Sequence, residues 1–419
     1  MKHFQATPIQ NIESQHTTKN YLNNSRSFET LIGLLSGIIP FTLAGRKLSF
    51  YNMFLDFLRA ICLKVISNNQ NHWQELMVTG SDFAQLLLQL DMATVIDNKA
   101  VLHPKYAAKQ QYRPLRKQQR HYQFIIQLIS YYNHNDARIP ISNGWKRMIL
   151  DKKLDYEIRL CETLINLEKF EVGKKIKSPF KDSYYTGSGE NAFNSYTKLI
   201  FLNYANLINE TTGLKNILDI GCGYGNSIDT LIGNHPSVST TGIELNQEVA
   251  SATKQKFKDI ARVAIVNKSI FDYQPDKKFD LILLNYVLFY FSHDEKVILF
   301  KHLDRLLSED GRILVCQYYS GIENMKVSLS SIHGDTNFSK KIEIYYANKI
   351  SYANTLWNNT VDAFKEAERF DLFQNILNTT GFCMYRIFPA DKFYYSFFIE
   401  ITRQHEKGRV EKGFNASSI

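Results

Sequence analysis

The stretch Asn216-Ile-Leu-Asp-Ile-Gly-Cys-Gly-Tyr-Gly-Asn226 decides the fold of this chain. Four residues, 217–220, form an apolar run that contains one acid, which predicts a buried strand. Three glycines then predict a turn, and a helix pattern starts at Ser227. A parallel strand that leads into a glycine turn and a helix places backbone N–H groups and a positive helix end at the strand's carboxyl end. The stretch therefore predicts a site for a nucleotide-like ligand.

From Lys215 onward the sequence alternates between strand and helix patterns. This alternation predicts an α/β, Rossmann-like doubly wound sheet. The last two strands meet around Pro389-Ala-Asp391 and should form an antiparallel pair at the sheet edge. The seven expected strands are 216–220, 239–244, 262–267, 279–285, 311–317, 384–388 and 394–402.

The 419 residues suit two domains rather than one core. We predict a loose arm (1–27), a mostly α-helical domain (28–172), a linker (173–190), the sheet domain (191–403) and a flexible tail (404–419). Within the helical domain, Ser81 or Asp82 can cap a helix. That helix is followed by two short strands around Asp97-Asn98.

Composition limits the classes of protein that fit. An apolar content of 44% and a charged content of 22% are ordinary for a soluble globular protein. The five cysteines form no CxxC pair, so we expect reduced thiols and a cytoplasmic protein. The most apolar run, 31–44, is interrupted by Gly33, Gly37 and Pro40 and falls short of the roughly 20 residues that a membrane span needs.

The net charge of +9 and the basic run 105–121 are the features that favour nucleic acid. A charge run of this kind is more often a solvated helix face, and we interpret it so. The alternative, a module that docks on nucleic acid or a partner protein, predicts a salt-dependent association through this run.

The ligand is indicated by the spacing and by three neighbours of the glycines. The spacing is GxGxG, whereas the dinucleotide fingerprint is GxGxxG. Asp219, two residues before the first glycine, would repel a pyrophosphate and attract a sulfonium and a free amino group. Glu244 follows about 20 residues later, where an acid accepts the ribose hydroxyls. Ile270 and Phe271, after the third strand, can sandwich an adenine.

With these residues, the stretch 215–317 resembles the class I S-adenosylmethionine (SAM)-dependent methyltransferases. Leu-Asp-Ile-Gly-Cys-Gly-Tyr-Gly matches their first motif, Gly-Ile-Glu-Leu their second, and Leu-Leu-Ser-Glu-Asp-Gly-Arg-Ile-Leu-Val the approach to their fifth strand. The resemblance implies SAM as cofactor and a seven-stranded sheet. The helix and hairpin of the helical domain resemble the winged-helix unit of small-molecule methyltransferases, which implies a homodimer that does not bind DNA.

The resemblance also implies the cofactor residues. Asp219, Gly221 and Gly223 would surround the methionine part, and Glu244 would hold the ribose. Ser269 stands where the family often has an acid beside the adenine amino group, so whether Ser269 or the later Asp272 contacts that group stays open. The full predicted set is Asp219, Gly221, Gly223, Glu244, Leu245, Ser269, Ile270, Phe271 and Asn285.

The acceptor side should be formed after strands four and five. An aromatic wall of Tyr286, Phe289, Tyr290 and Phe291 suits a small, partly apolar acceptor, and the absence of an Asn-Pro-Pro-Tyr motif counts against DNA methylation. We predict His293 and His333 as catalytic residues. His293 could equally cap the following helix, and His333 is expected in a loop, 330–335.

Two histidines and an acid in one pocket could also bind a divalent metal that chelates a 2-oxo acid for C-methylation. The layout is similar to that of the 2-oxo acid C-methyltransferases of the 2-ketoarginine type, which implies natural-product biosynthesis. The alternative is O- or N-methylation of a small aromatic or amine metabolite.

Overall fold

A computed structural model describes residues 7–8, 43–79, 81–107, 116–151, 154–177, 195–335 and 337–404. The chain forms two compact units. We call Met1–Thr17, Ser178–Ser351 and Ala363–Ile419 the sheet unit, and Thr18–Lys177 with Tyr352–Asp362 the helical unit. The predicted domain boundaries remain predictions, but the segment Tyr352–Asp362 was expected in the sheet domain and clusters with the helical unit instead.

The sheet unit contains an eight-stranded sheet in the order β1-β9-β10-β8-β7-β4-β5-β6. Strands β8, β7, β4, β5 and β6 run parallel, and β10 lies antiparallel between β8 and β9. The prediction of a doubly wound methyltransferase-type sheet with a final antiparallel pair is confirmed. The strands are β1 (Thr7–Pro8), β4 (Asn216–Ile220), β5 (Ser239–Ile243), β6 (Val263–Val266), β7 (Phe279–Asn285), β8 (Leu307–Tyr318), β9 (Phe382–Pro389) and β10 (Ser396–Arg403).

Strand β1 corrects the expectation of a loose arm. Thr7 and Pro8 pair antiparallel with Ile387 and Arg386 at the sheet edge. An edge strand tolerates a proline because one side of its backbone needs no partner. The rest of 1–27, most of the apolar run 31–44, the linker from 178 and the tail after 404 lie outside the described residues.

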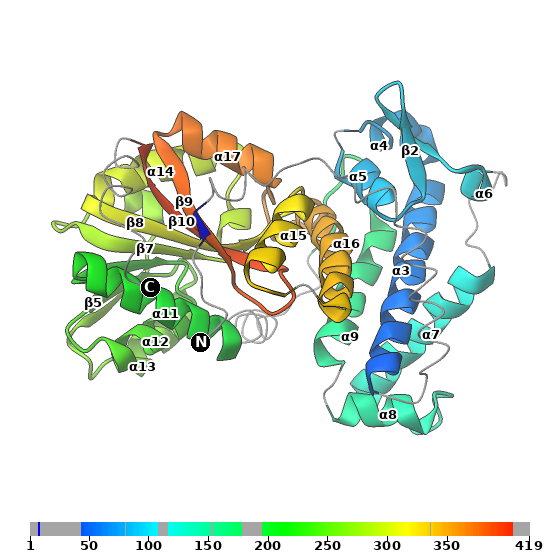
Figure 1. Ribbon diagram of the computed structural model, residues 1–419, viewed down its shortest axis with the longest axis horizontal. Coiled ribbons are helices and arrows are strands. Elements are labelled where there is room, and N and C mark those ends of the chain that lie inside the picture. Colours follow the sequence, from blue (N-terminus) through cyan, green and yellow to red (C-terminus); the bar gives the residue numbers. More distant parts are fainter. Residues whose placement is uncertain are drawn as a thin grey trace. The chain divides into compact units, whose positions relative to one another are not determined.

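Helices cover both faces of the sheet (Figure 1). Helices α11 and α12 pack on one face, where Phe201, Tyr204 and Leu231 join the alternate residues of β4, β7 and β8. Helices α14 and α17 pack on the other face through Leu299, Phe300 and Phe373. The helices are α11 (Ser195–Thr212), α12 (Asn226–Asn234), α13 (Gln247–Lys256), η4 (Ile270–Asp272), η5 (Leu288–Tyr290), α14 (His293–Leu306), α15 (Glu323–Ile332), α16 (Phe338–Thr360) and α17 (Phe370–Thr379).

The expected loop 330–335 is wrong at its start, because α15 continues to Ile332. The hydroxyls of Ser330 and Ser331 both donate to the carbonyl of Val327, so these serines satisfy their hydrogen bonds inside the helix. His333 is the C-cap residue, and Gly334 follows with a positive φ of 73°. The helix therefore ends at the glycine, as glycine C-caps commonly do.

The helical unit confirms the predicted helix and hairpin. The Ser81 hydroxyl caps α5 by accepting from the Ala84 N–H. Asp97 and Asn98 both have positive φ, which suits a two-residue hairpin turn between β2 and β3. The elements are α3 (Leu43–Asn68), η2 (Gln70–His72), α4 (Trp73–Leu76), α5 (Asp82–Gln89), β2 (Ala93–Ile96), β3 (Lys99–Leu102), α6 (Pro104–Ala107), α7 (Arg116–His134), α8 (Asn143–Leu150), α9 (Asp155–Leu164) and η3 (Ile165–Lys169).

The described part of the basic run begins α7. Arg116, Lys117 and Arg120 are exposed there, and the Lys117 ammonium lies 3.5 Å from the carboxylate of Asp56. The interpretation as a solvated helix face fits these residues. Residues 108–115 of the run lie outside the described residues. None of the described helices is both long and apolar enough for a membrane crossing.

The buried charges of the outer strands generate a stability prediction. Glu400 on β10 is 1% exposed, and its carboxylate lies 3.5 Å from Arg312 on β8 and 3.4 Å from Arg386 on β9. Burial raises the pKa of Glu400, and the two arginines oppose that rise. Removing one member of a buried ion network leaves the others unpaired. Glu400→Gln should lower the free energy of unfolding by about 3–5 kcal/mol, measured by urea denaturation.

The matched control is Glu309→Gln, an exposed glutamate on β8. That variant should unfold at nearly the wild-type urea concentration. Equal midpoints for the two variants would contradict the assignment of the Arg312–Glu400–Arg386 network as a stabilising feature.

Candidate functional site

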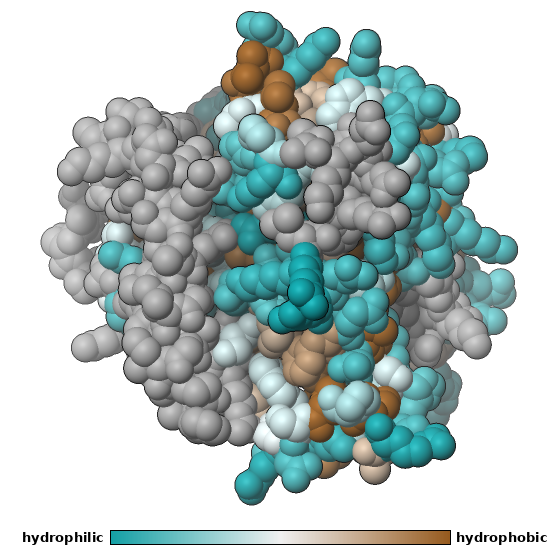
Figure 2. Space-filling model, turned by 90° about the vertical axis from the view of Figure 1, so that its right-hand side faces the viewer, coloured by the Kyte–Doolittle hydropathy of each residue, from teal (hydrophilic) through white to brown (hydrophobic). Residues whose placement is uncertain are grey.

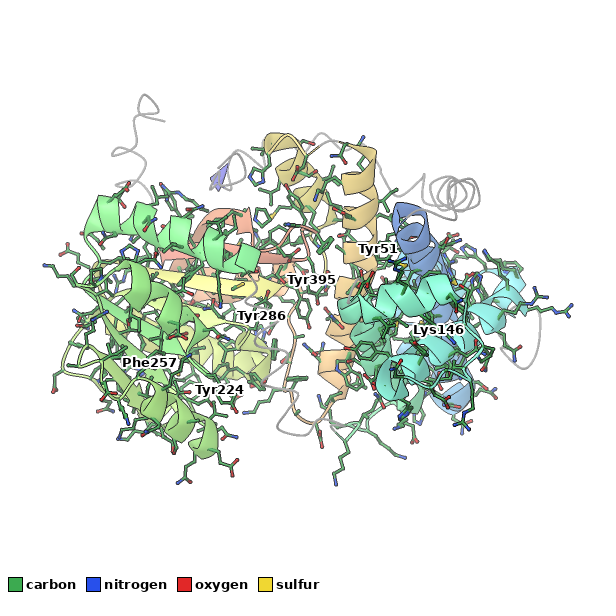
Figure 3. All side chains as sticks on the ribbon, turned by 90° about the horizontal axis from the view of Figure 1, so that it is seen from below. Tyr51, Lys146, Tyr224, Phe257, Tyr286 and Tyr395 are labelled. Atoms are coloured by element: carbon green, nitrogen blue, oxygen red, sulfur yellow. The ribbon has the colours of Figure 1, made fainter. Side chains whose placement is uncertain are left out.

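The three glycines after β4 adopt positive φ angles of 67°, 52° and 76° at Gly221, Gly223 and Gly225. A side chain at Gly221 would lie 2.7 Å from Val287, and one at Gly225 would lie 2.4 Å from Phe257. Figure 3 shows Phe257 and Tyr224 of the turn in the same part of the sheet unit. A side chain at Gly223 would meet no atom within 4 Å. The turn therefore closes tightly at its ends and leaves space at its middle glycine.

Asp219 lies at the carboxyl end of β4 and is 1% exposed. By hydrogen-bond geometry neither of its carboxylate oxygens has a partner among the described residues, although the Ser227 hydroxyl lies near enough to act on the carboxylate. Burial raises the pKa of Asp219 to about 7, the carboxylate of Glu244 adds to the rise, and the Ser227 hydroxyl opposes it. A buried, unpaired acid is costly, so it indicates a place for a cation or a hydrogen-bond donor.

Asn285 adds a further unpaired acceptor beside Asp219. It ends β7, which pairs parallel with β4, and its side-chain N–H donates to the Ser227 hydroxyl at 2.8 Å. Its Oδ1 is buried without a partner in the described part of the chain. Asp219 and Asn285 thus present three buried acceptor oxygens at the carboxyl ends of two neighbouring strands. An ammonium group, with three N–H donors, is the kind of group that satisfies such a set.

Glu244 follows β5, where the sequence predicted it. Its Oε2 accepts from the Gly223 N–H at 3.1 Å, and its Oε1 accepts from the Asn246 N–H at 2.8 Å. Each carboxylate oxygen has two lone pairs, so one on each oxygen stays available for a hydroxyl donor. The Asn267 side chain donates to the carbonyls of Glu244 and Leu245 and holds this loop.

The predicted adenine residues form an apolar border next to Glu244. Leu245 is 73% exposed, although it is apolar. Ile270 is buried, and the half-buried Phe271 ring meets Phe291 edge-on at 5.7 Å. The Ser269 hydroxyl accepts from the Phe271 N–H and caps η4. Its O–H hydrogen is still available to a ligand, and the contact to an adenine amino group remains a prediction.

His293 is the first residue of α14, but it does not cap the helix. Ser292 and Glu295 do so, each accepting from the other's backbone N–H. The His293 Nδ1 lies 3.0 Å from Oε1 of Glu368, whose side chain is only 2% exposed. A buried carboxylate that orients a half-exposed imidazole is an arrangement that general bases use. Glu368 lies 75 residues from His293, and no local pattern in the sequence indicated this pair.

His333 has different partners. Its Nδ1 lies 3.2 Å from the Tyr394 hydroxyl, which donates to Asp335 at 2.9 Å. In the parts of the chain that the structure describes, no group of three His, Cys, Asp or Glu side chains is placed to hold a metal ion. The two histidines therefore differ in surroundings. The described residues contain no cluster of the kind predicted from the sequence, in which both histidines could bind one metal ion.

Comparison with known proteins identifies the domain that carries this site. Residues 218–313 match a family model described as a methyltransferase domain. A malonyl-[acyl-carrier protein] O-methyltransferase 2 of Ilyobacter polytropus is 29% identical over 134 residues, 32% of this chain and 51% of that protein. Myricetin 3-O-methyltransferase 3 of Solanum habrochaites is 24% identical over 221 residues, 53% of this chain and 54% of that protein. The chain spans about half the length of these curated relatives.

Two solved structures are also similar to parts of this chain. An O-methyltransferase family 2 protein from Planctomyces limnophilus, in complex with apigenin, has a TM-score of 0.47 and 12% identity over 84% of this chain and 95% of that chain. A magnesium protoporphyrin IX methyltransferase from Synechocystis with bound SAM has a TM-score of 0.34 and 14% identity over 54% of this chain and 87% of that chain. The chain carries a methyltransferase domain.

The raised pKa of Asp219 generates a prediction with a definite sign. A free aspartate has a pKa near 3.9, whereas burial raises the pKa of Asp219 to about 7 in the folded chain. The stability that this group contributes is therefore complete below about pH 4 and is lost as the pH rises through 7. Asp219→Asn should raise the unfolding free energy of the ligand-free protein at pH 8 by an amount on the order of 4 kcal/mol at most.

Urea denaturation at pH 4.5 and pH 8 measures this effect, and Asp276→Asn, at an exposed position, is the control. The two variants should differ at pH 8 and agree more closely at the lower pH. An unchanged pH dependence in Asp219→Asn would show that Asp219 is already paired in the folded protein.

Proposed function

We propose that this chain is an SAM-dependent methyltransferase that acts on a small molecule. The methyltransferase domain supports the reaction class. The observation that carries the cofactor assignment is the set of three buried acceptor oxygens of Asp219 and Asn285. SAM offers an α-ammonium and a sulfonium, both cationic, whereas a dinucleotide would offer a pyrophosphate that this set repels.

The residues of the site fit the other parts of SAM. Glu244 keeps lone pairs for the two ribose hydroxyls, while Leu245, Ile270 and Phe271 offer apolar surface to the adenine. The open space at Gly223 would take the methionine backbone. When bound, SAM supplies an activated methyl group. The protein's contribution is then to align the acceptor with that group and to remove the acceptor's proton.

Proton removal is assigned to His293, held by Glu368. Behind it, Phe289, Tyr290 and Phe364 pack with ring centroids 4.9–5.4 Å apart, which supports a small, partly aromatic acceptor. His333 remains a second candidate because its Nδ1 contacts the Tyr394 hydroxyl, which in turn donates to Asp335.

Between oxygen and carbon acceptors, the His293–Glu368 pair favours a hydroxyl. Two relatives whose names specify O-methylation support the same choice. C-methylation of a 2-oxo acid in natural-product biosynthesis is the second candidate. It also needs a base, but its metal-assisted form needs a cluster that the described residues do not provide. An activity screen against phenols, 2-oxo acids and amines separates these acceptors.

A cytoplasmic homodimer remains part of the proposal. Val95, Ile96 and Val101 on the hairpin β2–β3 are 55%, 53% and 41% exposed, which supports an apolar contact between helical units. Figure 2 shows brown, hydrophobic areas on a face of the molecule that is otherwise mostly hydrophilic. Light scattering that gives a monomeric mass would overturn this part.

Cofactor binding is tested by a thermal-shift titration with SAM, its demethylated product and NAD. The first two should raise the melting temperature and NAD should not, because a ligand stabilises the state that binds it. Glu244→Gln should weaken SAM binding about 10-fold or more by removing charged acceptors of the ribose hydroxyls. Glu248→Gln, an exposed glutamate one turn later, should bind like the wild type. A wild-type protein that SAM does not stabilise would refute the proposal.

The role of His293 is tested in the acceptor screen. His293→Gln should lower the rate of methyl transfer about 100-fold, the smaller end of what a general base contributes, and leave the SAM thermal shift unchanged. His134→Gln, at an exposed position of α7, is the control and should keep full activity. Wild-type rates in His293→Gln would move the assignment to His333.

A further inference from the structure

We infer that Lys296 is a positioning residue for His293, acting through Glu368: it determines which ring nitrogen of His293 carries the proton. This inference rests on the proposed function, in which His293 takes a proton from the acceptor. Nothing in the sequence pattern separates Lys296 from Lys301, the other lysine of α14, and its role follows from what its ammonium touches.

Lys296 follows His293 by three residues on α14, so the two side chains lie on one face of the helix. The Lys296 side chain is only 1% exposed, and its ammonium donates to the Glu366 carbonyl at 2.7 Å and to Oε1 of Glu368 at 3.2 Å. The same Oε1 lies 3.0 Å from Nδ1 of His293. One carboxylate oxygen thus joins a buried ammonium to the imidazole.

The other side of Glu368 faces a small polar cavity. Oε2 of Glu368, Oε1 of Gln317 and the hydroxyl of Tyr319 are buried there without a partner among the described residues. The cavity has room for little more than one water molecule. Bulk water therefore does little to screen the charge of Glu368. In the described part of the chain, Lys296 is the lysine that balances this charge.

Other charged groups near this centre are already engaged. Oε2 of Glu366 accepts from the His293 backbone N–H at 2.8 Å, and Glu295 forms an ion pair with Lys365. Burial lowers the pKa of Lys296, and Glu368, followed by Glu366 and Glu295, opposes that fall. The hydroxyl of Tyr319, whose pKa burial raises, stays neutral at working pH. Lys296 and Glu368 are thus the pair on which the charge at His293 depends.

The position of the ring proton follows from this pair. With Lys296 present, Glu368 is a carboxylate and accepts from Nδ1–H, so Nε2 is bare on a ring that is 44% exposed. Without the ammonium, the buried carboxylate either takes up a proton or draws one onto the imidazole. In the first case the carboxyl O–H donates to Nδ1 and the single ring proton moves to Nε2. In the second case the ring carries a proton on both nitrogens. A ring that carries its proton on Nε2 cannot accept one there from an acceptor.

The test is nitrogen NMR of histidine-labelled full-length protein at pH 8, with His293→Gln to assign the signals. Two-bond nitrogen–proton couplings distinguish the two tautomers. In the wild type and in Lys296→Arg, which keeps the charge, His293 should be mainly the Nδ1–H form. In Lys296→Met the Nε2 nitrogen should carry a proton, in the Nε2–H or the doubly protonated form. Lys296→Gln keeps a donor to the Glu366 carbonyl and provides the neutral variant should the methionine variant fail to fold.

A folded neutral variant in which His293 keeps the wild-type Nδ1–H form would overturn the inference and leave Lys296 a structural ion pair. The SAM thermal shift, measured on the same samples, should be the same in all variants, because Lys296 does not contact the proposed cofactor residues. Its absence in the wild type would refute the proposed function instead, and the tautomer result would stand separately.

Discussion

The structure depends on one energetically costly feature, the carboxyl group of Asp219, which is buried at the carboxyl end of β4. Among the described residues neither of its oxygens has a partner in good hydrogen-bond geometry, and the Ser227 hydroxyl only partly offsets the effect of burial. The glycine turn and β7 hold this cost locally, because a side chain at Gly221 would collide with Val287 and because Asn285 is fixed by Ser227. Tight packing around an acid without a partner prevents the protein's own side chains from reaching that acid. A site for a cationic ligand is then already formed before the ligand binds.

Much of this frame could be predicted from the sequence. The strands of the parallel sheet are short apolar runs, and the glycine spacing with Asp219 and Glu244 predicted a cofactor site at their carboxyl ends. Strand β1 was missed because Thr7 and Pro8 lie in a polar segment and pair only through their backbone. The end of α15 was missed because serines and a glycine indicate a loop, whereas the hydroxyls of Ser330 and Ser331 bond back into the helix. Both misses are backbone or side-chain hydrogen bonds that hydrophobic periodicity does not report.

The acceptor side was predicted less completely, for a physical reason. His293 could be singled out because it follows a strand end, but its partner Glu368 is brought to it only by the packing of the segment before α17 against η5. The backbone N–H groups of Lys365 and Glu366 both donate to the carbonyl of Phe289, which fixes that segment in place. A contact between residues 75 positions apart leaves no trace in local spacing. Likewise, Ser227 and Asn267 hold cofactor-side residues through side-chain bonds that no motif requires.

The proposed cofactor side and the proposed acceptor side each contain a buried acid, but only one of these acids is paired with a cation. The difference fits the proposed partners, a cationic cofactor for Asp219 and an imidazole for Glu368. No cation of the described residues acts on Asp219, so in the proposed function its charge is available to a cationic donor molecule. Glu368 has its own cation in Lys296, so its charge is already balanced and can orient an imidazole. If the lysine were paired with Asp219 instead of Glu368, the proposed SAM site would lose its attraction for a cation. The imidazole would in turn lose its basic nitrogen. In the proposed function, the placement of a single lysine thus separates a binding acid, Asp219, from a positioning acid, Glu368.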